Sequence, residues 1–189
     1  MRKKVLVILA PGCEEIEAVA IIDVLRRAEM NVTVAGLGGT DINGAHGIRF
    51  RTDIALDDYD KSPDAVILPG GMPGSRNLGQ SKKVTEILQK AGRANKLIGA
   101  ICAAPALALA PAGILDGKKA TCYPGFEQNF AKSVTFSEDR VVVDGNVITS
   151  RGPGSALEFA LELVDRLAGS EKARELRSAL LVIPAGTRV

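Results

Sequence analysis

Short aliphatic runs alternate along this chain with segments of helical periodicity. The uninterrupted apolar runs lie at residues 5–10, 32–35, 65–68 and 97–101. Such runs are typical of parallel strands that are covered on both faces. Between them, residues 14–27 and 81–93 space their apolar side chains as amphipathic helices do. Strands alternating with helices predict an α/β sandwich with a mostly parallel central sheet and helices on both faces.

The last third of the chain follows a different pattern. Helices are expected over the alanine-rich residues 103–112, from 155 to about 167, and over 171–181. Short strands are expected at residues 119–123, 133–136, 141–143 and 147–149, the last two forming a hairpin, and a half-exposed strand or hairpin arm at 48–54. Since no linker or repeat interrupts these elements, residues 1–189 are predicted to form a single domain.

Charge and aromatic content exclude several classes of partner. The chain has 24 basic and 22 acidic residues, a formal charge of +2, which is too small to indicate a polyanion partner such as nucleic acid. The six-residue apolar run at 5–10 is too short for an export signal, and the apolar stretch 100–112 contains two prolines and is too short to span a bilayer. We therefore expect a cytoplasmic protein that contacts neither nucleic acid nor membrane.

The chain is poor in metal-binding and general-base side chains. It contains three cysteines, Cys13, Cys102 and Cys122, and one histidine, His46. This set excludes a zinc finger, leaves little for a Cys–His or Ser–His catalytic pair, and predicts no metal and no cofactor. The odd number of cysteines does not suggest a disulfide framework, which favours a reducing compartment.

Cys102 is the strongest candidate for a nucleophile. It follows the apolar run 97–101 and has Ala100 and Ala104 two positions away on either side. Small neighbours at a sharp strand-to-helix turn are what a nucleophile elbow requires, and a helix N-terminus lowers the pKa of a thiol. The alternative is a small buried cysteine without chemistry.

Glu17 is the second candidate, because the apolar residues Ile16 and Ala18 flank it near the predicted pocket. A carboxyl held beside a thiolate cannot easily ionise as well, so one of the two groups should keep a proton. Glu14 and Glu15, in the same turn, are read as charges that complement the helix dipole.

Gly70 and Gly71 directly follow the run 65–68. They would allow close approach to a ligand and present N–H donors to an oxyanion; the alternative is a plain tight turn. His46 lies between glycines and is read as a solvated loop residue.

Four segments in this order resemble the ThiJ/PfpI superfamily and, more narrowly, its DJ-one branch, the parkinsonism-associated protein and its bacterial and plant relatives. They are residues 9–17 (LAPGCEEIE), 68–71 (LPGG), 100–105 (AICAAP) and 149–154 (TSRGPG). The resemblance covers nearly all of the chain. It implies a flavodoxin-like fold, a homodimer with pockets near the interface, and a reactive, easily oxidised Cys102. Glu17 would be its protonated partner, and the N–H groups of Gly71 and Ala103 would line the oxyanion site.

The same resemblance implies weaker roles for two residues. Arg27 matches a basic residue near the pocket, and His46 falls where an arginine of a relative reaches across the dimer. Two departures matter for the chemistry: Ala103 replaces the histidine of the protease-like branch, and Tyr123 stands in the region where the human member has a histidine. Both departures argue against a cysteine peptidase.

The reported activities of the family define the functional hypotheses. The first is a cofactor-free glyoxalase or deglycase, a lyase or hydrolase that converts an α-oxoaldehyde such as methylglyoxal, or an early glycation adduct, into a 2-hydroxy acid. The second is an oxidative-stress sensor or chaperone that acts through oxidation of Cys102. A peptidase is the third and would require His46 of a partner subunit near Cys102.

Overall fold

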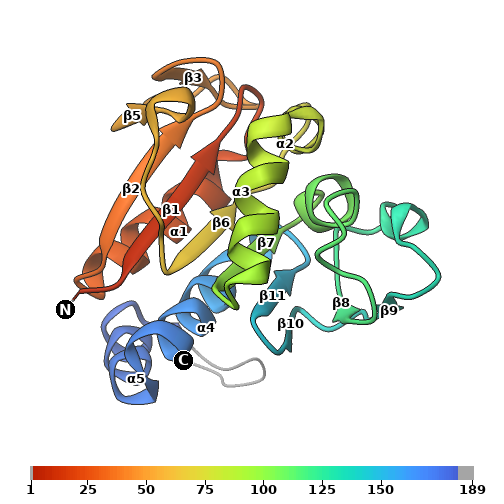
Figure 1. Cartoon of the computed structure of the whole chain (residues 1–189). Coiled ribbons are helices and arrows are strands. Elements are labelled where there is room, and N and C mark those ends of the chain that lie inside the picture. The colour runs from red at the N-terminus through yellow and green to blue at the C-terminus, as the bar shows by residue number, and fades with distance from the viewer. Residues whose placement is uncertain (1, 183–189) are drawn as a thin grey trace.

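A seven-stranded sheet forms the centre of the molecule, in the order β10-β11-β7-β6-β1-β2-β5 (Figure 1). The structure is a computed structural model and describes residues 2–182. All neighbouring strands are parallel except the β10–β11 hairpin. The strands are β1 (Lys4–Leu9), β2 (Asn31–Gly36), β5 (Ile54–Ala55), β6 (Ala65–Leu68), β7 (Leu97–Ile101), β10 (Val141–Asp144) and β11 (Val147–Ser150).

Helices cover both faces of this sheet, which confirms the predicted layers. One face carries α1 (Glu15–Arg27), α4 (Ala156–Ala168) and α5 (Ser170–Ala179). The other carries α2 (Gly74–Gln80) and α3 (Lys82–Arg93), and α3 lies in front of the sheet in Figure 1.

The packing of β1 explains why its residues from Val5 to Leu9 are all apolar. Val5 and Val7 pack into the cluster formed with α1 and α4, whereas Leu6 and Ile8 pack into the cluster formed with α2 and α3. Successive side chains of a strand point to opposite faces, so a strand with a core on each side needs apolar residues at every position.

The strand order also places the functional loops. The chain passes from β1 to β2 in one direction along the sheet and from β2 through β5 back to β6, on the other side of β1. Ligands of open α/β sheets bind beyond the carboxyl ends of the strands at such a reversal. The loops after β1, β6 and β7, which contain the predicted site residues, all end at this edge.

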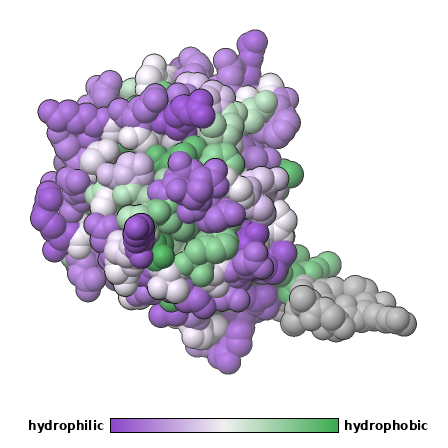
Figure 2. All heavy atoms as spheres, turned by 90° about the vertical axis from the view of Figure 1, so that its right-hand side faces the viewer, coloured by the Kyte–Doolittle hydropathy of each residue, from purple (hydrophilic) through white to green (hydrophobic). Residues whose placement is uncertain are grey.

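Two small pairs of strands lie outside the main sheet. The hairpin of β3 (Asp41–Asn43) and β4 (Arg49–Arg51) confirms the predicted hairpin arm. The strands β8 (Lys119–Ala120) and β9 (Thr135–Phe136) pair in parallel on the side of the molecule that Figure 2 faces, where hydrophilic side chains surround a smaller hydrophobic area.

Some predicted elements were wrong in type or extent. The expected helix at 103–112 is a short π-helical segment, Pro105–Leu109, followed by turns; the N–H of Ala110 donates to the carbonyl of Pro105, five residues back. Pro111 has no N–H to donate and its ring would clash with the carbonyl of Leu107, so a regular α-helix cannot continue to residue 112. The expected strand at 119–123 ends at Ala120, and α2 was not predicted because its glycines, serine and asparagine are poor helix formers.

Two further predictions concern membrane contact and the extent of the domain. Within residues 2–182, every helix is too short or too polar to cross a lipid bilayer. The predicted domain, 1–189, includes residue 1 and residues 183–189, which lie outside the described residues.

Candidate active site

Cys102 lies on a sharp turn immediately after β7. Its backbone φ is +65°, in the left-handed region that side-chain-bearing residues rarely adopt. Two hydrogen bonds hold this conformation: the N–H of Cys102 donates to the carbonyl of Ser150 at 2.9 Å, and the N–H of Tyr123 donates to the carbonyl of Cys102 at 2.8 Å. The chain therefore forms an elbow at the predicted position, with Cys102 7% exposed.

Glu17 lies in the first turn of α1 and is fully buried. Its Oε2 accepts a hydrogen bond of 2.7 Å from the backbone N–H of Gly70. Its Oε1 is buried and has no hydrogen-bond partner among the described residues. Burial raises the pKa of Glu17 to about 7, and the hydrogen bond from Gly70 opposes this shift. A raised carboxyl pKa agrees with the expectation that one member of the pair keeps a proton.

Gly70 brings Glu17 and Cys102 together, because a side chain at position 70 would fill the space between them. A Cβ on Gly70 would overlap the Cβ of Cys102 and lie 2.7 Å from Oε2 of Glu17. The next residue, Gly71, has φ +92°, a conformation that glycine adopts without strain. The two glycines therefore let the loop after β6 pass directly against the thiol and the carboxyl.

The pKa of the Cys102 thiol is raised, although the sequence predicted that it would be lowered. Burial, followed by the negative charge of Glu17, raises this pKa to about 12, and the nearby backbone N–H groups of Gly71 and Ala103 lower it only in part. The predicted net lowering was wrong for two reasons. The thiol is buried, and the helical segment after it is a single short π-helical segment with a weak dipole. Forming a thiolate here requires a base, and Glu17 is the adjacent one.

A second carboxylate, Glu15, has a role that the sequence reasoning missed. Glu15 is 4% exposed, and its Oε1 accepts the backbone N–H of His46 at 2.6 Å while Oε2 lies 2.9 Å from Nδ1 of His46. Burial raises the pKa of Glu15, but these hydrogen bonds outweigh burial and leave it lowered. The hydrogen bond and charge of Glu15 raise the pKa of His46. No local signal indicates this pair, because its members are 31 positions apart.

The remaining predicted residues are placed as follows. Tyr123 is 45% exposed, packs edge-on against Phe126, and contacts the elbow through its backbone. Arg27 is not in the pocket of its own chain: it pairs with Asp23 at the far end of α1, about 15 Å along the helix from Glu17. The position of Arg27 and His46 at a dimer interface stays a prediction.

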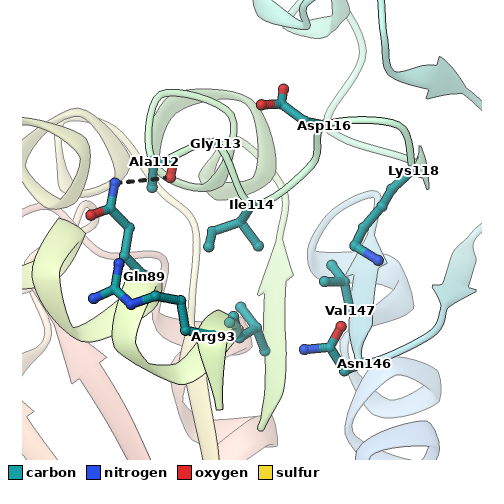
Figure 3. Close-up of a pocket in the computed structure, with 11 residues that line it drawn as sticks. Gln89, Arg93, Ala112, Gly113, Ile114, Asp116, Lys118, Asn146 and Val147 are labelled. Carbon is teal, nitrogen blue, oxygen red and sulfur yellow. Dashed lines mark hydrogen bonds between the residues drawn. The ribbon is translucent and has the colours of Figure 1, made fainter. Parts of the chain in front are cut away.

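A cavity of about 530 Å³ lies elsewhere. Its lining includes Ile98 and Val147, which face each other near the amino ends of β7 and β11, whereas Cys102 follows the carboxyl end of β7. Figure 3 shows Ile114 between Gln89 of α3 and Val147. This cavity is separate from the Cys102 site.

One group of side chains has the composition of a metal site. Glu14, Glu15 and His46 each place a ligand-type atom within 4.8 Å of the others. The atoms of Glu15 and His46 already bond to each other, so the hydrogen bonds account for the cluster.

Comparison with known proteins finds relatives that match most of this chain. The chain is 46% identical over 181 residues to protein DJ-1 homolog B of Arabidopsis thaliana, which covers 95% of this chain and 41% of that protein. It is 38% identical over 182 residues to the glutathione-independent glyoxalase DJR-1.2 of Caenorhabditis elegans, covering 95% of this chain and 96% of that protein. This chain thus spans less than half the length of the plant relative but nearly all of the nematode one.

A solved structure shows the same fold. The crystal structure of DJ-1beta from Drosophila melanogaster matches with a TM-score of 0.93 and 45% identity, over 97% of this chain and 100% of that one. The model of the DJ-1/PfpI family matches residues 3–166. The flavodoxin-like fold and the predicted resemblance are therefore confirmed, and this chain belongs to the DJ-1/PfpI family.

Proposed function

We propose that this protein is a glyoxalase that needs no cofactor and converts methylglyoxal or glyoxal into a 2-hydroxy acid. The observation that carries the proposal is the pairing of a buried thiol, Cys102, with a buried carboxyl, Glu17, against the backbone donors of one loop. The name of the nematode relative, glutathione-independent glyoxalase, supports this substrate class.

In the first step, the Cys102 sulfur adds to the aldehyde carbon. The thiol is protonated at neutral pH, so the Glu17 carboxylate accepts its proton as the C–S bond forms. Negative charge develops on the aldehyde oxygen, where the N–H groups of Gly71 and Ala103 are suited to stabilise it. Glu17 then returns the proton, giving a neutral hemithioacetal.

In the second step, the hemithioacetal becomes a thioester. Glu17 removes the proton from the carbon attached to sulfur, which leaves an enediolate with its negative charge on the oxygen of the second, neighbouring carbon. The hydroxyl proton on the first carbon passes to that oxygen. The same carboxyl returns the proton to that second carbon. Water then hydrolyses the thioester, releasing the 2-hydroxy acid and the Cys102 thiol. One water is consumed, and the substrate is oxidised at one carbon and reduced at the next, so no external oxidant is needed.

Mass spectrometry of the protein after exposure to methylglyoxal tests this proposal. We expect an adduct on Cys102 that forms and turns over in the wild type and forms much more slowly in Glu17→Gln, which lacks the base that accepts the thiol proton. Cys102→Ala controls for modification of other residues. An adduct that forms on Cys13 or Cys122 instead, with Cys102 unmodified, would overturn the proposal.

A redox sensor is the second candidate function, and one observation favours it. The unpartnered Oε1 of Glu17 belongs to a carboxyl with a pKa of about 7. In its protonated form this group can donate to an oxygen of a Cys102 sulfinate. Mild peroxide followed by peptide mass spectrometry tests the sensor: oxidation of Cys102 before the other cysteines supports it, and the reverse order rejects it.

We further propose that the chain works as a homodimer through the outer face of α1. Ile16 and Val19 are 61% and 52% exposed one helical turn apart, and Ile48 is 56% exposed on the adjacent hairpin. Exposed apolar side chains that gather on one face mark interaction surfaces. Sedimentation of Val19→Glu against the wild type tests this: a dimer that becomes a monomer supports the assignment, and an unchanged mass rejects it.

A further inference from the structure

Glu15 anchors a segment that is distant in sequence. Besides its two contacts with His46, its Oε1 lies 3.4 Å from the backbone N–H of Ile48. One carboxylate thus binds two backbone donors and one ring of the turn that joins β3 to β4. Since Glu15 is buried in the first turn of α1, this turn is tied to the same helix that carries Glu17.

The β3–β4 turn is hydrogen-bonded to the loop after β1. The N–H of Gly12 donates to the carbonyl of Asn43 at 2.7 Å, and the N–H of Ala45 donates to the carbonyl of Cys13 at 2.9 Å. Both bonds flank the Gly12–Cys13 peptide. The position of the β3–β4 turn therefore fixes the position of that peptide.

The loop after β1 then holds the donors beside the thiol. The N–H of Glu14 donates to the carbonyl of Gly70 at 3.0 Å, and the carbonyl of Gly12 accepts the N–H of Gly74 at 3.2 Å. The loop from Gly70 to Gly74 is thus bonded to the loop after β1 on both sides of Gly71. Gly71 is one of the two residues, with Ala103, whose backbone N–H lowers the pKa of Cys102.

Hydrogen bonds therefore link three segments between Glu15 and the sulfur of Cys102: the β3–β4 turn, the loop after β1, and the loop after β6. We propose that Glu15 is a positioning residue for the Cys102 site: by fixing the β3–β4 turn, its carboxylate sets the distance between the Gly71 N–H and the sulfur. This proposal rests on Cys102 being the reacting group of the proposed function, but not on the identity of the substrate.

Direct electrostatics and positioning predict opposite results. Removing a negative charge near a thiol lowers its pKa and speeds its alkylation. Loosening the Gly71 donor removes a stabilising contact from the thiolate and slows alkylation. The negative charge that raises the pKa of Cys102 is that of Glu17, whereas the charge of Glu15 raises the pKa of Cys13. The sign of the effect at Cys102 therefore distinguishes the two roles.

The test measures alkylation of Cys102 by iodoacetamide at fixed pH, followed at this residue by peptide mass spectrometry. We expect Glu15→Gln to slow the reaction by roughly 2- to 10-fold, the range that corresponds to one weakened hydrogen bond. Asp23→Asn, which removes an exposed acidic charge from the same helix, is the matched control and should leave the rate unchanged. A faster or unchanged rate in a folded Glu15→Gln protein contradicts the proposal.

A second variant tests the same geometry without changing any charge. A Cβ on Gly44 would overlap the carboxyl of Glu15, so Gly44→Ala pushes the turn away from its anchor. We expect slower alkylation of Cys102 and a shifted amide resonance of Gly71 in the NMR spectrum. An unchanged rate and an unchanged Gly71 resonance overturn the positioning role. Because alkylation needs no aldehyde, a wild type that forms no lactate would reject the proposed function while leaving this test intact.

Discussion

The backbone N–H of Gly70 donates to Oε2 of Glu17 at 2.7 Å, while Oε1 of the same carboxyl is buried without a partner in residues 2–182. The hydrogen bond fixes the orientation of the carboxyl, and the unpartnered oxygen is available for proton transfer. Burial raises the pKa of this group to about 7, so acid and base forms are both populated near neutral pH. This combination suits a group that must accept and return a proton in one catalytic cycle.

Glu17→Gln removes the proton-transfer group but keeps its size and an acceptor for Gly70. We expect kcat/KM for lactate formation to fall by roughly 10²–10⁴-fold, the usual contribution of a positioned acid–base group. In the wild type the rate should rise with pH through about 7, as the carboxyl ionises, and this rise should be absent from the residual activity of the variant. A variant that retains the full rate contradicts the assignment.

Glu17 also makes the stability of the fold depend on pH. Its pKa is about 7 in the folded chain against an ordinary value of 4.5, so the folded state binds the proton more tightly. The stabilisation is fully present below pH 4.5 and is lost as pH rises through about 7. Urea denaturation should therefore show Glu17→Gln to be more stable than the wild type at pH 8, on the order of 1–3 kcal/mol, with a smaller difference at pH 5. Equal differences at both pH values contradict the raised pKa.

The Cys102→Gly variant should be more stable than the Cys102→Ala variant. The φ of +65° suits glycine and strains any residue with a Cβ. Because this strain is worth roughly 1–2 kcal/mol, Cys102→Gly should have the larger free energy of unfolding although neither variant is active. Denaturation curves of the two proteins provide the measurement, and equal stabilities would show that the elbow relaxes.

His46 should titrate above the ordinary histidine value of 6.5. Its ring is 74% exposed, and its hydrogen bond with the Glu15 carboxylate favours the charged form. An NMR titration of the imidazole should give a raised pKa in the wild type and one close to the ordinary value in Glu15→Gln. An identical titration in both proteins would mean that the pair does not form in solution.

The sequence was informative where the signal is local. The uniformly apolar run of β1 predicts a strand with a core on each side, and the small residues around Cys102 predict the elbow. Both features depend on residues that are neighbours in the chain. The same holds for the β10–β11 hairpin, whose turn residues specify it.

The sequence was misleading for properties that depend on contacts between distant parts of the chain. The pKa of Cys102 depends on burial and on Glu17, which is 85 positions away. The pairing of Glu15 with His46 needs the β3–β4 hairpin to fold back onto α1, and an acidic residue in a first helical turn gives no sign of this. Alanine-rich residues after Cys102 favour an α-helix, but Pro111 prevents a regular one from continuing to residue 112.

Lactate formation from methylglyoxal by purified, chelator-treated protein, without glutathione, is the decisive assay for the proposed role of Cys102. We expect the wild type to form lactate, Cys102→Ala to form none above the uncatalysed rate, and Asp23→Asn to equal the wild type. Undiminished turnover in Cys102→Ala, or no turnover in the wild type, would contradict it.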